Sequence, residues 1–218
     1  MNFSDIALAR YSTKEFEAGK TIPDALFEQI LTLLRYAPSS VNSQPWHFVI
    51  AASEAGRKRM AKGVQGMFAF NEAKVLAASH VVLFCARTAI DESYMEHILD
   101  REAADGRFAD PAFKDRTRAG RATFVNIHRY DLKDAQHWME KQLYLNMGSI
   151  LLAAGALGID AVPLEGIDTR AMDVEFGLRE KGFTAVAAVA LGYRALSDVN
   201  ARLPKSRLPA EEVFTILA

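Results

Sequence analysis

The segment from residue 143 to 157 constrains the fold more than any other part of the sequence, because it has helical spacing but carries apolar or small residues on nearly every face. It forms the second half of the longest helical pattern, which runs from residue 133 to 157 and ends before Gly158, in the position of a C-terminal cap. A helix that is apolar all round must be covered on all sides. Burial at the centre of the domain and burial against a second subunit both satisfy this condition, and we favour a contribution from a second subunit.

Four apolar stretches predict β-strands, and helical patterns separate them along the chain. The strands are expected at residues 46–52, 81–86, 159–162 and 183–191, and the pattern of the first indicates burial on both faces. Helices are expected at residues 3–9, from Pro23 to about Ala37, and from a Ser53 N-cap toward Gly63. The alternation of strands and helices predicts a mixed α/β or an α+β sandwich in which helices cover a central sheet.

The sequence indicates a single domain that comprises residues 1–218. With 218 residues, 50% of them hydrophobic and 24% charged, the chain is long enough for one large core and has an ordinary globular composition. No repeats, low-complexity tracts or linkers rich in proline and glycine mark a domain boundary. Residues 91–130 are helical but rich in charge, with a break at residues 105–107, and we expect them to form a solvated excursion from the core.

The charge and the hydropathy of the chain argue against a nucleic-acid-binding, a membrane-spanning or a secreted protein. A formal net charge of -1 gives no global field that would collect nucleic acid or an anionic membrane surface. No apolar run reaches the ~18 residues that are needed to span a bilayer. The first residues do not resemble a secretory signal, so the cytoplasm is the expected location.

The cysteine and the histidines argue against a metal site. Cys85 is the only cysteine, so neither an intrachain disulfide nor a cysteine-rich metal site is expected, and its apolar neighbours favour a buried structural thiol. The histidines lack the spacing of metal ligands on one helix face. We expect surface positions or structural hydrogen bonds for all five of them: His47, His80, His97, His128 and His137.

Basic and small polar residues gather in loops that could hold a phosphate monoester. These clusters lie at residues 10–14, at residues 38–45, at Asn71 with Lys74, and at residues 205–207. Arginine and lysine beside hydroxyl groups and free backbone N–H groups are suited to bind phosphate, although each cluster alone is also consistent with a solvated turn. The sequence contains no dinucleotide fingerprint, Walker loop, nucleophile elbow or H-E-x-x-H motif. Because two clusters lie near opposite chain ends, folding could bring them together.

Taken in order, six stretches of the chain resemble the oxygen-insensitive NAD(P)H nitroreductases, which are FMN enzymes with activities that include dihydropteridine reduction. The stretches lie at residues 10–14, 38–48, 70–74, 104–108, 158–166 and 203–209. The resemblance implies an α+β fold with a central, mostly antiparallel sheet flanked by helices and a long buried central helix. It also implies an intertwined homodimer with its flavin sites at the subunit interface.

The resemblance assigns residues to the two ends of FMN. The phosphate and ribityl end would be held by Arg10, Ser12, Lys205 and Arg207, with Tyr11 and Thr13 in the same stretch. Lys14 and Lys74 would lie near the pyrimidine edge of the ring, and Asn71 would hydrogen-bond to that edge. A reduced flavin carries negative charge near N1 and O2, which fixed ammonium groups stabilise. The phosphate-binding residues of the family thus coincide with the anion site that residue chemistry alone indicates.

Further cofactor contacts are implied below the ring and from the second subunit. The floor would be formed by Pro163, Leu164, Glu165 and Gly166, with the backbone N–H of Glu165 directed at flavin N5. The Glu165 carboxylate could instead act as a general acid, but hydride transfer needs positioning more than a titrating side chain, so we favour the backbone donor. The second subunit would supply Pro38, Ser39, Ser40, Asn42 and Gln142.

The open face of the flavin would receive the substrates. Phe124 would overhang this face and stack on a flat substrate, whereas its helical context alone favours a core residue. Contacts to the nicotinamide nucleotide or the substrate are expected from Lys14, Val41, Gln65, Phe68, Phe70, Asn71, Arg107 and Phe108. Val41 stands where close relatives often have threonine, and Tyr11 stands where they often have histidine. The candidate catalytic residues are Lys14, Lys74, Glu165 and Phe124.

The implied activity is a two-electron, ping-pong transfer of hydride from NADH or NADPH through bound FMN to nitroaromatics, quinones and dihydropteridines. One site would serve both partners in turn. A flavin reductase that releases reduced flavin and a flavin-binding protein without turnover are the alternatives. An anion-binding protein that uses the basic loops on nucleic acid fits poorly with the near-neutral charge.

Overall fold

A four-stranded antiparallel sheet forms the centre of the molecule in the computed structural model, which describes residues 2–217. The strands follow the order β1-β2-β4-β3, and every neighbouring pair is antiparallel. Their bounds are β1 Trp46–Ala51, β2 His80–Arg87, β3 Asp160–Leu164 and β4 Phe183–Gly192. All four strands lie where the apolar stretches predict them, and the antiparallel pairing confirms the α+β alternative.

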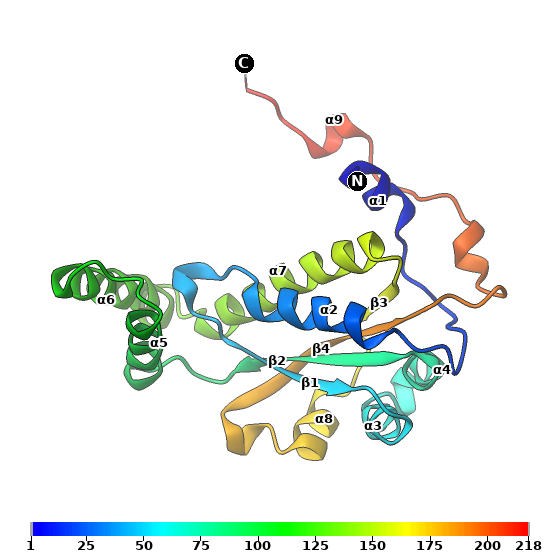
Figure 1. Cartoon of the computed structure of the whole chain (residues 1–218), viewed down its shortest axis with the longest axis horizontal. Helices are drawn as coiled ribbons and strands as arrows, with labels where there is room; N and C mark the ends of the chain where they lie inside the picture. The colour runs from blue at the N-terminus through cyan, green and yellow to red at the C-terminus, as the bar shows by residue number, and fades with distance from the viewer. Residues whose placement is uncertain (1, 218) are drawn as a thin grey trace.

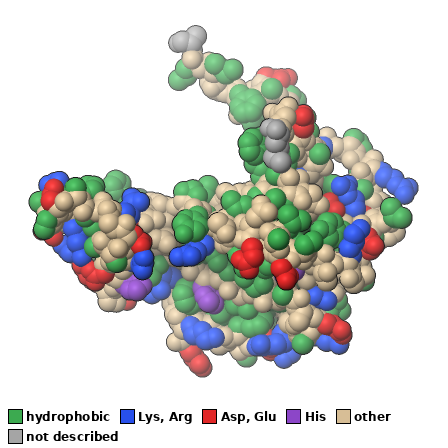
Figure 2. Space-filling model, in the orientation of Figure 1, with side chains coloured by type: hydrophobic (Ala, Val, Ile, Leu, Met, Phe, Trp, Pro, Cys, Tyr) green, Lys and Arg blue, Asp and Glu red, His purple; other side chains and the backbone are tan. Residues whose placement is uncertain are grey.

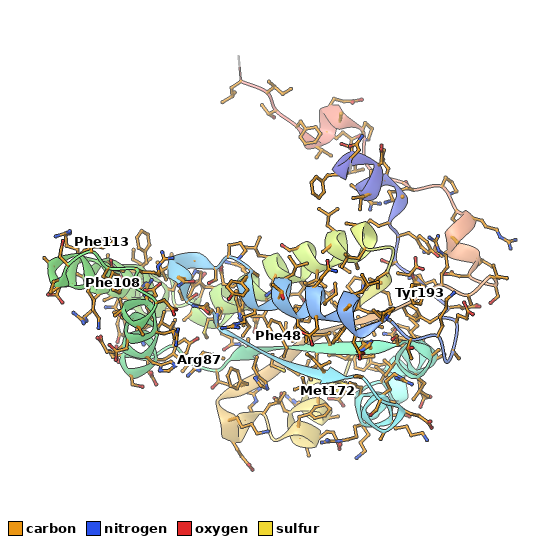
Figure 3. All side chains as sticks on the ribbon, in the orientation of Figure 1. Phe48, Arg87, Phe108, Phe113, Met172 and Tyr193 are labelled. Carbon is orange, nitrogen blue, oxygen red and sulfur yellow. The ribbon has the colours of Figure 1, made fainter. Side chains whose placement is uncertain are left out.

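Helices cover both faces of the sheet (Figure 1). Successive side chains of a strand point to opposite faces. Val81, Leu83 and Cys85 of β2 therefore pack in one core cluster, whereas its Val82 and Phe84 pack in the other. The first cluster includes residues of α3 (Glu54–Met60), α4 (Glu72–Ala77) and α8 (Thr169–Phe176), from which Met172 points toward the sheet in Figure 3. The second includes residues of α2 (Asp24–Tyr36) and α7 (Ala135–Ala156).

The ends of the helices follow the predicted signals closely. The Ser53 side chain accepts a hydrogen bond from the Gly56 backbone and caps α3 as expected. Helix α7 ends at Ala156, and Gly158 then takes a left-handed φ of 71°, as its predicted role at the C-terminal cap requires. Helix α7 begins two residues later than the predicted residue 133, because Lys133 has a φ of 53° and cannot continue a helix. Short helices α1 (Phe3–Ala9) and α9 (Ala210–Val213) lie near the chain ends.

Strand β1 corrects one prediction, because it is not buried on both faces. It lies at the edge of the sheet, where it pairs only with β2. His47 and Ile50 are exposed along it, and the Ile50 side chain is 37% accessible. The apolar composition of the stretch does not distinguish an edge strand from a central one, because the order of strands in a sheet depends on long-range pairing.

The charged excursion is present and has a small core of its own. It comprises α5 (Glu92–Ala104), α6 (Pro111–Asn126) and a π-helical turn at Ile127–Asp131, and the predicted break lies between α5 and α6. Its core contains Trp138 and Met139 from the start of α7. Figure 2 shows charged side chains of both signs over this end of the molecule, and many of them form ion pairs such as Arg118 with Glu96.

Helix α7 is covered on one side only within the described residues, so burial at the centre of the domain does not account for all of its apolar faces. Leu143, Met147 and Ile150 lie in the core, whereas Tyr144 is 42% exposed and Leu145 is 49% exposed. The C-terminal segment also exposes apolar side chains, namely Val213, Phe214, Ile216 and Leu217. It projects away from the rest of the chain in Figure 1. Two apolar surfaces therefore lack a partner within residues 2–217.

Cys85 and most histidines have the structural roles that the sequence predicts. Cys85 is fully buried, and burial raises the pKa of its thiol to about 12. His80 is hydrogen-bonded to Ser79 and stacked on Phe27, and His128 contacts Asp134. Within residues 2–217, no group of three or more potential ligands could hold a metal ion. No helix in this part of the chain is sufficiently long and apolar to cross a membrane.

Candidate functional site

A pocket of about 400 Å³ lies where residues 8–12 meet residues 200–207, and we call it the basic pocket. Its lining includes Arg10, Ser12, Lys205 and Arg207. The Lys205 ammonium donates hydrogen bonds to the backbone carbonyls of Ala7, at 2.6 Å, and Arg10. The structure therefore brings together the two basic clusters that are separated by almost the whole chain.

The cations of the basic pocket have no carboxylate partner among the described residues. Desolvation lowers the pKa of Arg10, and the nearby charge of Arg207 lowers it further. Desolvation likewise lowers the pKa of Lys205, and both arginines add to this effect. Because like charges are held together without compensation, the pocket favours the binding of an anion.

The backbone that carries the N-terminal part of this site is fixed by buried polar contacts. Asp198, which is 1% exposed, accepts hydrogen bonds from the Tyr11 hydroxyl at 3.0 Å and from the Lys14 backbone at 3.1 Å. Asn200 donates to the Ser12 carbonyl at 2.8 Å. The Thr13 side chain is buried beneath this segment, and its hydroxyl has no hydrogen-bond partner. The segment thus presents Ser12 and Lys14 at the surface of the pocket region and keeps Thr13 in the core.

A second group of predicted residues lies around Gly166, after strand β3. The Asn71 amide donates to the Gly166 carbonyl at 2.9 Å, and the Lys74 ammonium donates to Asn71 Oδ1 at 3.0 Å. Desolvation lowers the pKa of Lys74, and the charge of Lys14 contributes to the shift. Lys14 thus adds its positive charge to the Asn71 and Lys74 group.

Glu165 is oriented by a contact with the central helix. The Tyr144 hydroxyl of α7 donates to Glu165 Oε1 at 2.7 Å. Desolvation, the hydrogen bond to Glu165 and the charge of that carboxylate raise the pKa of Tyr144 to about 12, so the phenol remains a donor throughout the neutral range. The Glu165 carboxylate is therefore engaged by a neighbouring side chain.

Replacement of Gly166 by alanine is expected to weaken the site without unfolding the protein. A Cβ at this position would lie 2.9 Å from Asn71 Nδ2 and 2.9 Å from the Phe70 ring, so the Asn71 hydrogen bond must shift. We expect flavin affinity to fall about fivefold, the equivalent of about one hydrogen bond. Fluorescence titration with FMN measures this change. Gly120→Ala is the matched control, because the added Cβ meets nothing within 4 Å. An equal affinity for FMN in both variants would contradict the role of the Gly166 contact.

A third group of predicted residues lies at the other end of the chain's fold, beside α5 and α6 (Figure 1). Gln142 of α7 accepts a hydrogen bond from the Ser40 backbone at 2.8 Å, so these two predicted residues meet within one chain. The loop of residues 38–44 that contains Ser40 is called the flavin loop below, after its expected contact with the cofactor. The structure separates this loop from the basic pocket, so one chain does not bring the two together.

The predicted substrate-side residues are spread over both ends. Phe124 is 55% exposed on α6, which argues against a simple core role. Phe70 is 66% exposed beside the Asn71 and Lys74 group, whereas Phe68 packs against the core. Phe108 lies at the outer end of the excursion, with its ring 5.6 Å from that of Phe113 (Figure 3). Of the remaining predicted contacts, Val41 packs on the core of the excursion and Arg107 is exposed. Gln65 donates a hydrogen bond to Glu72.

Residues 7–193 match the sequence profile of the Nitroreductase family. The chain belongs to the nitroreductase family. It is 52% identical to the oxygen-insensitive NAD(P)H nitroreductase of Enterobacter cloacae over 215 residues, which are 99% of each chain. It is 33% identical to the major NAD(P)H-flavin oxidoreductase of Aliivibrio fischeri over 95% of each chain.

Solved structures support the fold assignment. A protein of Exiguobacterium sibiricum, crystallised in complex with FMN, superposes with a TM-score of 0.80 at 24% identity. The match covers 100% of this chain and 98% of that one. At this identity the likeness concerns the fold, which is that of the nitroreductase family.

Three polar residues that hold the site of this nitroreductase were not recognised from sequence. Asp198 fixes the segment of Tyr11 and Lys14, Tyr144 orients Glu165, and Glu102 accepts a hydrogen bond from Asn42 at 2.6 Å. Each lies far along the chain from the residue it contacts. The one sequence signal for Glu102 is an acidic residue just before the predicted break at residues 105–107, and that signal is weak.

Proposed function

We propose that the protein is an FMN-dependent NAD(P)H oxidoreductase that reduces nitroaromatics, and also quinones and dihydropteridines, by two-electron transfer. The observation that carries this proposal is the gathering of Arg10, Lys205 and Arg207 without a carboxylate partner among residues 2–217, on a segment whose Lys14 adds its charge to the group of Lys74. An anion pocket and an amide and ammonium cluster, which the segment of residues 10–14 connects, would suit the two ends of FMN. The oxygen-insensitive NAD(P)H nitroreductase of Enterobacter cloacae, at 52% identity, supports the same activity.

The residues of the chain fit the cofactor in their chemistry. The basic pocket would hold the phosphate, with Ser12 adding a hydroxyl, and Lys14, Lys74 and Asn71 would face the polar edge of the ring. Bound FMN supplies the capacity to accept a hydride from NAD(P)H and to pass two electrons to the acceptor. The two ammonium groups would stabilise negative charge at the ring edge, and the Glu165 backbone N–H would position the ring while Tyr144 holds the Glu165 carboxylate.

The open side of the ring would receive the donor and the acceptor in turn. Phe124 supplies an exposed aromatic ring that can stack on a flat substrate. No polar side chain of the chain is required to select one acceptor under this arrangement, so the acceptor range is expected to be wide. Val41 carries no hydroxyl, which would leave this part of the acceptor site apolar.

The site is completed in this proposal by a second copy of the chain. The flavin loop and Phe124 lie at the opposite end of the fold from the basic pocket, so one chain alone does not surround the cofactor. The exposed face of α7, with Tyr144 and Leu145, and the apolar C-terminal segment offer surfaces for such a contact. Figure 2 shows hydrophobic side chains gathered on that projecting segment.

A second candidate function is the reduction of free flavin for use by another enzyme. It is favoured by the 33% identity to the major NAD(P)H-flavin oxidoreductase of Aliivibrio fischeri. The two candidates differ in the acceptor and share the same residues for the bound cofactor. Steady-state reduction of added FMN, compared with reduction of a nitroaromatic at equal concentration, separates them.

The proposed function predicts a reversible change in the visible spectrum under anaerobic conditions. The purified protein should show a flavin spectrum that bleaches with NAD(P)H, because the hydride is accepted at the site, and that returns when a nitroaromatic is added. A protein that binds FMN but does not bleach would be a flavin-binding module without turnover. A colourless protein that takes up no added FMN would overturn the proposal and leave the basic pocket as a site for another anion.

A further inference from the structure

The carboxylate of Glu102 lies at the junction of α5, α6 and the flavin loop, and the proposed reaction does not use it. Glu102 is 4% exposed, and its Oε1 accepts hydrogen bonds from Asn42 Nδ2 and from the Arg121 guanidinium, each at 2.6 Å. Burial acts to raise the pKa of Glu102, but the hydrogen bonds from Arg121 and Asn42 outweigh it and hold the pKa below its ordinary value. Glu102 is therefore a buried carboxylate that reaches a loop 60 residues away.

The flavin loop needs such support because its backbone is strained. Val41, Asn42 and Gln44 have φ values of 49°, 54° and 43°, in the left-handed region that favours glycine. The conformation is least favourable for Val41, whose β-branched side chain crowds the backbone. Residues in this region persist only where the surroundings hold them, so the contacts around the loop decide its shape.

Three side chains outside the loop hold it in place. Gln142 accepts a hydrogen bond from the Ser40 backbone, and the Tyr94 hydroxyl of α5 donates to the carbonyls of Ser43 at 3.0 Å and Gln44 at 2.7 Å. These contacts fix the two ends of the strained stretch. Glu102 holds the left-handed Asn42 between them through its side-chain amide.

We propose that Glu102 is a positioning residue, whose carboxylate holds Asn42 in its left-handed conformation and thereby sets the direction of the flavin loop. The proposal rests on the proposed function, in which this loop reaches the cofactor and the acceptor. The same oxygen also accepts a hydrogen bond from Arg121 on α6. The flavin loop and the excursion, which carries Phe124, are therefore both hydrogen-bonded to Glu102. Glu102 acts on the reaction through Asn42 and does not contact the reacting atoms.

A pair of double variants separates this role from a merely structural one. Removal of Glu102 alone would leave the buried charge of Arg121 unpaired and could unfold the excursion. In Glu102→Gln/Arg121→Met the charges of this buried pair are absent but an acceptor oxygen for Asn42 remains, and the exposed Arg107, which lies 3.7 Å from Glu102 Oε1, is the same in both variants. In Glu102→Met/Arg121→Met both the charges and the acceptor are absent. Replacement of a buried ion pair by apolar side chains of similar volume is often neutral for stability, so both proteins should fold.

Amide hydrogen exchange of the peptide that covers residues 38–45, measured without FMN, tests the position of the loop directly. The Asn42, Ser43 and Gln44 amides donate hydrogen bonds within this loop, and their protection reports its shape. We expect Glu102→Gln/Arg121→Met to exchange like the wild type and Glu102→Met/Arg121→Met to exchange about tenfold faster, since opening becomes easier. Equal exchange in the two variants would overturn the proposal, whether or not the protein binds flavin.

Steady-state kinetics provide the second readout. With a nitroaromatic acceptor, we expect KM to rise about fivefold in Glu102→Met/Arg121→Met, because contacts between the loop and the acceptor are lost. We expect kcat to stay within about threefold of the wild-type value, because the cations at the ring edge are retained. The glutamine variant should restore the wild-type KM. A wild type that does not reduce the acceptor would refute the proposed function alone. If the wild type reduces the acceptor and KM is the same in both variants, only the role of Glu102 is refuted.

Discussion

Replacement of Leu145 by glutamate is expected to leave the protein monomeric and unable to retain FMN. Leu145 is 49% exposed on the uncovered face of α7, next to Tyr144, and lies where the proposed partner subunit would pack. An unpaired carboxylate buried in an apolar interface costs about 3 kcal/mol or more, which weakens association roughly a hundredfold or more. Because the flavin loop would come from the partner, loss of the dimer should also remove bound flavin.

Light scattering during size-exclusion chromatography measures the mass, and the ratio of absorbance at the flavin and protein bands measures cofactor content. Val174→Glu is the matched control, because Val174 is 85% exposed on α8, on the opposite side of the sheet. This control should remain dimeric and yellow. A dimeric Leu145→Glu protein with full flavin content would show that the α7 face is not the subunit interface.

Replacement of Lys74 or Lys14 by methionine is expected to slow flavin reduction and to lower the flavin's reduction potential. The Lys74 ammonium is held by Asn71 Oδ1, and desolvation and the charge of Lys14 lower its pKa, so the two cations act on the same region. Loss of one preorganised positive charge should slow hydride transfer roughly tenfold to a hundredfold. A weakening of about 1.4 kcal/mol corresponds to about 30 mV for a two-electron couple.

Stopped-flow reduction by NAD(P)H and a redox titration against a reference dye measure the two quantities. Lys58→Met changes an exposed cation that pairs with Glu54 on α3, and it should alter neither quantity. If the potential is unchanged in both site variants, the electrostatic role of Lys14 and Lys74 is wrong, even if the rates fall.

The strands and helices could be predicted because local patterns determine them. Val81 to Ala86 forms a buried strand because its side chains alternate between two cores, and this requires apolar residues at every position. The N-cap at Ser53 and the left-handed Gly158 are also local signals. The position of a strand within the sheet is not local, so the exposure of Ile50 on the edge strand β1 could not be read from its neighbours.

The basic clusters could be recognised as candidate anion sites because phosphate chemistry limits the side chains that bind it, although each cluster alone was also consistent with a solvated turn. The family resemblance assigned Arg10 and Lys205 to one phosphate, and the structure places these two residues together. The support beneath the site could not be predicted in the same way. Val41 and Asn42 have left-handed φ angles although neither is a glycine, so the sequence carries no local signal for this conformation. Glu102 holds Asn42 only because α5 folds against the flavin loop.

The burial of Cys85 makes the protein suited to site-specific labelling. Its thiol is fully enclosed in the sheet and has a pKa of about 12, so it contributes little thiolate near neutral pH. Maleimide dyes and spin labels should therefore leave the native chain unmodified. A cysteine introduced at an exposed position such as Phe113, at the outer end of the excursion, would then carry the single probe. Fluorescence or electron paramagnetic resonance could follow the motion of α5 and α6 during turnover without first removing the natural cysteine.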